Sequence, residues 1–160
     1  MEELVRVYSS KRNLTDGIQR PMPALDHFHA IVRNALIKDG WTITDDPLTL
    51  PVGRRTLAID LGAERSLIGA ERDKQRIAVE IKTFGGASPV ADLQQALGQF
   101  VMYKSILSQA EPGRKLYLAV AEEVRDSIFS EEVGLLALRE YIDRIFYFSV
   151  AREEIVEWKP

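Results

Sequence analysis

The segment that most constrains the fold is residues 77–83, Ile-Ala-Val-Glu-Ile-Lys-Thr, in which branched aliphatic residues occupy every second position. On a β-strand these aliphatic side chains share one face, and Glu80 and Lys82 share the other. An α-helix would instead spread the same residues around its circumference. The segment therefore predicts a sheet strand that holds a carboxylate and an ammonium group side by side.

Helices and strands are predicted on both sides of this strand, from the period of the apolar residues and from the turn residues between them. A proline-containing break at residues 20–23 precedes a first helix that ends at Gly40, and Ser88 with Pro89 begins a second one. Further strands are expected at residues 41–44, 55–61, 66–70, 115–121, 145–150 and 154–158, a polar turn at residues 72–75, and helices at residues 24–39, 88–108 and 131–141.

The length of 160 residues predicts one domain, which we place at residues 23–160, preceded by an N-terminal extension at residues 1–22. The chain has no cysteine, which excludes a disulfide framework and a thiolate metal site and agrees with a reducing cytoplasm. No apolar run is long enough for a bilayer, and the N-terminus has no secretory apolar core. We therefore expect a cytoplasmic protein without a membrane segment.

The charge balance argues against strong stand-alone DNA binding. The formal net charge is −3 and the isoelectric point is about 5.5. A protein that coats DNA is expected to be basic, because it must neutralise phosphates. Any role on DNA would therefore need a local basic patch, a transient encounter or a more basic partner.

The candidate chemistry comes from a second acidic residue, Asp60, on the strand predicted at residues 55–61. Asp60 and Glu80 each lie opposite an apolar strand face, and two carboxylates that converge there are costly unless a positive charge joins them. Carboxylates suit Mg²⁺ or Mn²⁺. Lys82 projects from the same face as Glu80 and is suited to orient a water molecule and to stabilise charge on a phosphate.

Two residues on the second long helix strengthen this hypothesis. Gln99 and Tyr103 are four residues apart, so they lie on one helix face and are placed to reach the metal region or a phosphate. Without them, a Glu-X-Lys sequence on a strand is more typical of a charge pair that faces solvent. The order of strand aspartate, strand Glu-X-Lys and helical Gln-X-X-X-Tyr favours the metal site.

Other polar residues are weaker candidates. Asp26 and His29 share a stripe of the first helix, where they would line the site, cap the helix or pair with Arg33. Glu64 follows Asp60 by four residues and is more typical of a hairpin surface. The Arg54-Arg55 pair would hold phosphate or lie in a solvated turn. Trp41 and Trp158 are expected to pack at the core or at a sheet edge.

This order of motifs resembles the PD-(D/E)XK nuclease superfamily, and the match covers roughly residues 24–121. The resemblance implies an α/β fold of the restriction-endonuclease-like type, with a central mixed β-sheet flanked by helices. Ile59 stands where the motif of the superfamily has proline. The site that the resemblance implies consists of Asp60, Glu80 and the Ile81 backbone carbonyl as metal ligands, Lys82 as the catalytic lysine, and Gln99 and Tyr103 as the helix motif.

A longer resemblance, to the XisH family, extends over most of the chain. It is carried by residues 26–29 (Asp-His-Phe-His), 35–41, 46–48, 60–64, 78–82, 96–99, 116–120 and 155–158. The family is named for controlling excision of the fdxN element during heterocyst development in cyanobacteria, and it is usually found with a small partner, XisI. The resemblance therefore implies a role in DNA rearrangement, with a XisI-like protein and DNA as partners.

Three functions stay open at this point. The first is a Mg²⁺-dependent endonuclease that hydrolyses DNA phosphodiesters. The second is a regulatory subunit of the same fold that works with XisI and a site-specific recombinase without cutting. The third is a structural subunit of a hetero-complex. The intact set of Asp60, Glu80 and Lys82 favours the first, and the acidic charge favours the second. The sequence does not distinguish a homo-oligomer from a hetero-oligomer.

Overall fold

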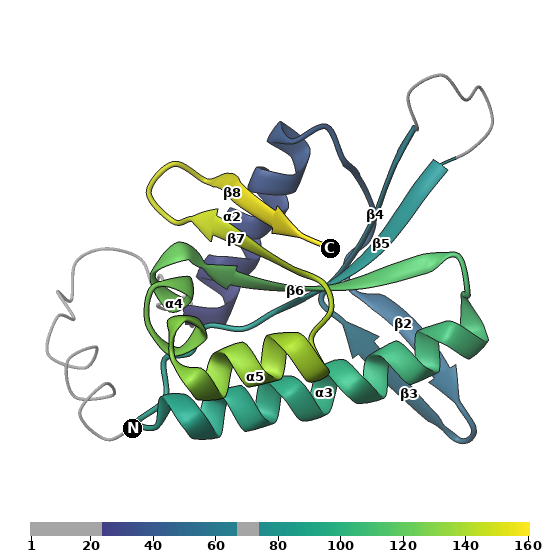
Figure 1. Ribbon diagram of the computed structural model, residues 1–160. Helices are drawn as coiled ribbons and strands as arrows, with labels where there is room; N and C mark the ends of the chain where they lie inside the picture. The colour runs from purple at the N-terminus through teal and green to yellow at the C-terminus, as the bar shows by residue number, and fades with distance from the viewer. Residues whose placement is uncertain (1–23, 67–73) are drawn as a thin grey trace, which may run out of the picture.

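A six-stranded mixed sheet with the order β1-β4-β5-β6-β7-β8 forms the centre of the fold (Figure 1). The computed structural model describes residues 24–66 and 74–160, with side chains described from His27 onward. The sheet strands are β1 (Thr42–Asp45), β4 (Leu61–Ser66), β5 (Lys74–Ile81), β6 (Arg114–Ala121), β7 (Ile145–Ser149) and β8 (Glu154–Lys159). Strands β5, β6 and β7 are mutually parallel, and the other pairs are antiparallel. The predicted class, a mixed sheet within an α/β fold, is confirmed.

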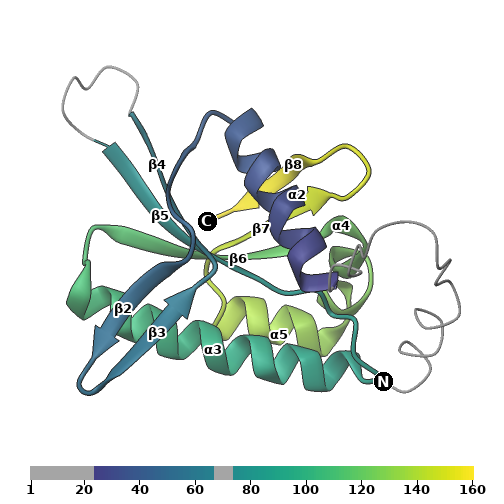
Figure 2. The ribbon, with the colours of Figure 1, turned by 180° about the vertical axis from the view of Figure 1, so that it is seen from behind.

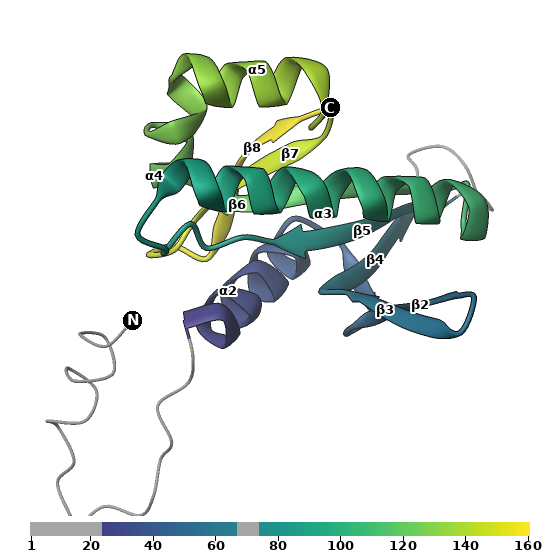
Figure 3. The ribbon, with the colours of Figure 1, turned by 90° about the horizontal axis from the view of Figure 1, so that it is seen from below.

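Helices cover both faces of this sheet, as predicted. Figure 3 shows α2 on one face and α3 and α5 on the other, and Figure 2 shows α2 lying across its face of the sheet. The helices are α2 (Ala24–Lys38), α3 (Pro89–Ala110), α4 (Glu122–Arg125) and α5 (Glu132–Glu140), with a 3-10 turn η1 (Ile128–Ser130). Helix α4 and turn η1 were not predicted. Across the described residues, no helix combines the length and the apolar character that a membrane span requires.

The prediction of one strand at residues 55–61 is wrong. The chain forms β3 (Arg55–Ile59), which pairs with β2 (Leu48–Val52) in a separate hairpin, breaks at Asp60, and continues as β4 in the main sheet. The apolar alternation runs through the break because Ile59 and Leu61 are both fully buried, one in each sheet. A period-two pattern reports which side chains are buried and does not report a change of partner strand.

The polar turn predicted at residues 72–75 is also placed differently. Lys74 and Gln75 belong to β5, where they pair with Ser66 and Arg65 of β4. This end of the β4–β5 hairpin extends beyond the helices (Figure 1), so polar residues are accommodated there. Of the strand predicted at residues 66–70, only Ser66 is described, and it ends β4. The extension at residues 1–22 lies outside the described part of the chain.

The strand at residues 77–83 is confirmed in its central part. Ile77, Val79 and Ile81 are at most 1% exposed, so the aliphatic face is fully within the core. The assigned strand ends at Ile81, although the Lys82 N–H still donates to the Ala119 carbonyl at 3.1 Å. Parallel pairing with β6, which is itself interior to the sheet, continues the backbone ladder to the position of Lys82.

Two tryptophans, one just before edge strand β1 and one within edge strand β8, hydrogen-bond to the same carboxylate. The indole N–H groups of Trp41 and Trp158 both donate to Asp39 Oδ2, at 3.2 Å each. The two rings also pack against each other with centroids 5.8 Å apart. Both residues therefore pack within the fold, as predicted.

We predict opposite effects for two glycine-to-alanine substitutions in helices. In Gly134→Ala the new Cβ would overlap the Ile128 carbonyl and lie 2.7 Å from the Phe129 Cα, so we expect a loss of about 1–3 kcal/mol in the free energy of unfolding. In Gly98→Ala nothing lies within 4 Å, and α3 should gain roughly 0.5–1 kcal/mol. Urea denaturation measures both, and an equal effect of the two substitutions would contradict the packing of α5 on η1.

Candidate functional site

The register of β4 on β5 brings two predicted site residues together. Leu61 pairs with Val79 and Gly62 with Ala78, so continuing the antiparallel register by one residue places Asp60 opposite Glu80. Directly opposite residues have Cβ atoms about 4.5–5.5 Å apart. Asp60 Oδ2 also accepts the Ile81 N–H at 2.8 Å, which fixes the aspartate against the end of β5.

Glu80 is buried beside this aspartate and lacks full hydrogen bonding. Glu80 is 7% exposed to solvent, and its Oε2 is buried without a hydrogen-bond partner in the described part of the chain. Its Oε1 lies 3.7 Å from Lys82 Nζ. Burial, followed by the negative charge of Asp60, raises the pKa of Glu80 to about 7, and the nearby Lys82 opposes that increase only in part. A buried carboxylate of this kind is costly to ionise.

Asp60 experiences the same environment. Burial raises the pKa of Asp60, while its hydrogen bond from the Ile81 N–H and the charges of His29 and Lys82 act in the opposite direction. Each carboxylate therefore resists ionisation, and the single lysine does not compensate for both. Among the described residues, the Glu80–Lys82 contact is the one salt bridge of the pair.

A divalent cation fits this donor set. Two hard oxygen ligands with an unpartnered lone pair suit Mg²⁺ or Mn²⁺, and the predicted Ile81 carbonyl would be a third protein oxygen. Within residues 24–66 and 74–160, no three Asp, Glu or His side chains gather into a larger metal-binding group. Mg²⁺ commonly keeps several water ligands, so a small protein donor set is typical of it.

Helix α3 brings one of its two predicted residues to the acidic pair. Tyr103 is 9% exposed, and its pKa is raised first by burial and then by the charges of Glu80 and Asp60. Gln99 lies one turn earlier on the same helix face, and its Oε1 is buried without a hydrogen-bond partner among the described residues. The phenol thus lies within electrostatic range of both carboxylates.

His29 reaches the site from α2 and is held by a residue that sequence reasoning missed. Its Nε2 lies 2.6 Å from Asp46 Oδ1, and Arg33 Nε lies 3.3 Å from the other oxygen of Asp46. The charges of His29 and Asp46 both alter the pKa of Asp60, in opposite directions. The sequence indicated only a turn at Asp46-Pro47, and no local pattern marks a turn carboxylate as a histidine partner. The Asp26 side chain lies outside the described residues.

The remaining weak candidates lie away from the acidic pair. Glu64 is in the β4–β5 hairpin, where its carboxylate is 2.9 Å from Lys74 Nζ and 3.9 Å from Arg76 Nε. This is the hairpin surface role that its position predicted. Arg54 lies in the exposed turn between β2 and β3, and Arg55 begins β3, at the opposite end of that strand from Asp60. The structure therefore does not bring the arginine pair to the carboxylates.

Comparison with known proteins agrees with the family resemblance. The family model described as XisH protein matches residues 22–156. A crystal structure of a fdxN element excision controlling factor protein from Anabaena variabilis is 38% identical, with a TM-score of 0.75, covering 84% of this chain and 99% of that one. An XisH family protein from Nostoc punctiforme PCC 73102 is 36% identical, with a TM-score of 0.74, covering 84% and 100%. A search of curated proteins finds no match.

The raised pKa of Glu80 predicts how stability depends on pH without metal. Because the folded pKa of about 7 exceeds the ordinary 4.5, the folded state binds more protons between these values, and the free energy of unfolding falls as pH rises through them. The full cost above pH 7 is about 3 kcal/mol. We expect Glu80→Gln to be more stable than the wild type at pH 8, with a smaller difference at pH 5.

Urea denaturation in the presence of a chelator measures this difference. Glu64→Gln is the matched control, because it removes a carboxylate from the neighbouring strand outside the site. A Glu80→Gln effect that is the same at pH 5 and pH 8 would show that Glu80 is not held in a desolvated, acid-paired environment.

Proposed function

Because the chain belongs to the XisH family, we propose that it is an excision controlling factor with a Mg²⁺- or Mn²⁺-dependent DNA endonuclease site. The observation that carries the proposal is the buried Asp60–Glu80 pair with Lys82 beside it. A relative is named as a fdxN element excision controlling factor, and we extend that role, action in programmed DNA rearrangement, to this chain.

The residues that would hold the ion are Asp60, Glu80 and the backbone carbonyl of Ile81. When bound, a divalent cation supplies positive charge to the carboxylates and acts as a Lewis acid on the phosphate. The unpartnered Oε2 of Glu80 supports this assignment, because a buried oxygen without a donor is otherwise a net cost. Ionisation of both carboxylates is then expected to accompany metal binding.

Lys82 is assigned the electrostatic role in hydrolysis. Its ammonium group lies beside Glu80, where it can orient a water molecule and stabilise negative charge on a phosphate oxygen. In the reaction the water oxygen bonds to phosphorus and the phosphorus–oxygen bond to the leaving sugar breaks. The attacking water loses one proton and the leaving sugar oxygen gains one, so the net transfer is of one proton from the water to the sugar.

Three further side chains are assigned supporting roles. His29 is held at its Nε2 by Asp46 beside Asp60, so we assign it to assist proton transfer or positioning at the site. Gln99 and Tyr103 on α3 present an amide and a phenol that can hydrogen-bond to a substrate phosphate. His29 and Tyr103 lie within electrostatic range of the carboxylate pair and come from two different helices, which supports these roles.

The alternative function is a regulatory subunit that does not cut DNA. The net charge of −3 favours it, because an acidic protein attracts DNA weakly unless a partner contributes positive charge. In this alternative the chain binds a XisI-like protein and acts with a site-specific recombinase. Its contact with DNA would be transient in either case.

Cleavage of supercoiled plasmid with Mg²⁺ or Mn²⁺ tests the endonuclease directly. We expect nicked or linear product from the wild type, and a loss of roughly 100-fold or more in rate for Glu80→Ala and Lys82→Ala. Glu80→Ala removes a ligand of the cation, and Lys82→Ala removes a positive charge beside the reacting phosphate. Glu64→Ala, an acidic residue of the neighbouring hairpin, is the control and should retain activity. The reactions are run with and without the XisI-like partner.

Calorimetry of Mg²⁺ or Mn²⁺ binding separates the two functions. Binding by the wild type that Glu80→Ala removes, together with cleavage, supports the endonuclease. If the wild type binds no metal, the endonuclease proposal fails. Metal binding without cleavage under any partner condition would favour the regulatory subunit.

A further inference from the structure

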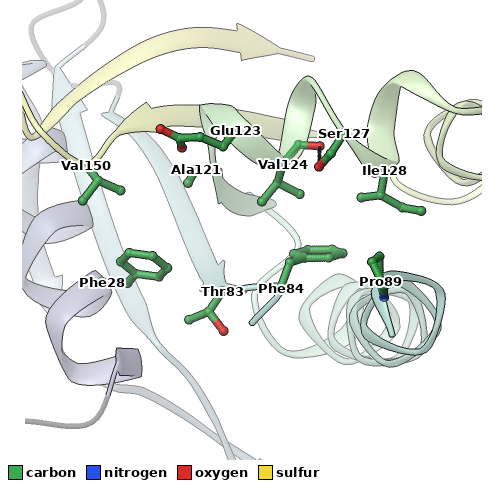
Figure 4. Close-up of a pocket in the computed structure, with 10 residues that line it drawn as sticks. All are labelled: Phe28, Thr83, Phe84, Pro89, Ala121, Glu123, Val124, Ser127, Ile128 and Val150. Atoms are coloured by element: carbon green, nitrogen blue, oxygen red, sulfur yellow. Dashed lines mark hydrogen bonds between the residues drawn. The ribbon is translucent and has the colours of Figure 1, made fainter. Parts of the chain in front are cut away.

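An open cleft of about 490 Å³ lies at the carboxyl ends of the three parallel strands (Figure 4). Thr83 follows the end of β5, Ala121 ends β6 and Val150 follows β7, and all three line the cleft. In open α/β sheets, ligands bind at this end of the strands. The volume falls within the range of roughly 300–1,000 Å³ typical of small-molecule sites.

Two phenyl rings give the cleft its chemical character. Figure 4 shows Phe28 and Phe84 on one side, opposite Val124 and Ile128. Both rings are partly exposed. Phe28 makes a T-shaped contact with buried Phe148, with centroids 5.9 Å apart, so its ring is supported from behind.

Phe84 is held in the same way, and its backbone conformation is unusual. Its ring makes a T-shaped contact with buried Phe129, with centroids 5.6 Å apart. Its φ is 52°, in the left-handed region that a bulky residue rarely adopts. Gly85 and Gly86 follow at once and would adopt this conformation without strain. Strain of this kind tends to be kept where a side chain must be aimed.

Two residues that line the cleft are chain neighbours of residues assigned to the acidic site. Phe28 directly precedes His29 on α2, and Thr83 directly follows Lys82 after β5. A ligand in the cleft would therefore lie near the two chain segments that carry His29 and Lys82.

The polar groups of the cleft favour an uncharged aromatic ligand over a phosphate. None of its ten lining residues, all within the described part of the chain, is Lys or Arg. The exposed Glu123 carboxylate would repel a phosphate but can accept a hydrogen bond from an exocyclic amino group of a base. Thr83 adds a hydroxyl group that can donate or accept, and the Ser127 hydroxyl, which donates to the Val124 carbonyl at 3.3 Å, can accept.

We infer that this cleft receives a nucleobase unstacked from DNA, next to the phosphate held at the acidic site. The inference rests on the proposed action on DNA and narrows the substrate to single-stranded or locally unpaired DNA. The base would lie against Phe28 and Phe84, since aromatic side chains offer a stacking surface to any base. An intact duplex keeps its bases stacked and would use the cleft only after a base is displaced.

The test measures binding of a short single strand that carries a fluorescent purine analogue, with a chelator present so that no cleavage occurs. We expect the wild type to change the fluorescence of the analogue and to bind this strand more tightly than the matching duplex. Phe84→Leu keeps an apolar side chain without the ring, and should weaken binding roughly ten-fold and abolish the fluorescence change. Phe84→Tyr keeps the ring and should behave like the wild type.

Tyr141→Leu is the matched control, because it removes an aromatic ring that is 52% exposed at the end of α5, outside the cleft. Circular dichroism of each variant checks that it is folded. A Phe84→Leu variant with unchanged affinity and unchanged fluorescence would overturn the inference. The inference would also be overturned if Phe84→Leu binds the strand normally but no longer binds the XisI-like protein, because the cleft would then be a protein-docking surface.

The result is separable from that of the plasmid assay. If the wild type cleaves DNA but Phe84→Leu leaves strand binding unchanged, the endonuclease proposal stands and the base-binding inference fails. If strand binding depends on the Phe84 ring but the wild type never cleaves DNA, the base-binding inference stands and the endonuclease proposal fails.

Discussion

The rest of the site depends on one constraint: the carboxyl groups of Asp60 and Glu80 lie opposite each other where both are largely buried. The β4–β5 register puts Asp60 opposite Glu80, and burial raises the pKa of both. Lys82 compensates for only part of the charge. Selection for stability alone would favour apolar residues at these two positions, because unpaired buried charge is costly. The presence of the pair supports the proposal that it binds a positively charged ligand.

The surrounding elements can be understood from how they position this pair. The chain leaves the β2–β3 hairpin at Asp60 and enters the main sheet at Leu61, so the aspartate lies at the junction of two sheets. Parallel pairing of β5 with β6 fixes the end of β5, where Glu80 and Lys82 lie. Helix α3 adds Tyr103, and α2 adds His29 from the other face of the sheet. Residues distant in sequence thus converge at one strand end.

The sequence predicted those parts that depend on local pattern and left out those that depend on partners. The alternation at residues 77–83 and the Ser88 cap, which accepts the Ala91 N–H at 3.2 Å, are local features and were predicted correctly. The change of sheet at Asp60 was missed because buried residues flank it on both sides. The pairing of Asp46 with His29 joins a turn to a helix, and no periodicity records such a contact.

The ionisation of Glu80 is the most direct test of this account. Carbon-13 NMR of the labelled side-chain carboxyl group, followed over pH with and without Mg²⁺, reports its pKa at the residue itself. The account predicts a pKa of about 7 in the metal-free protein and a marked decrease when Mg²⁺ is bound. A metal-free pKa near the ordinary 4.5, or a raised value that Mg²⁺ leaves unchanged, would contradict the claim that the carboxylate pair is built for a cation.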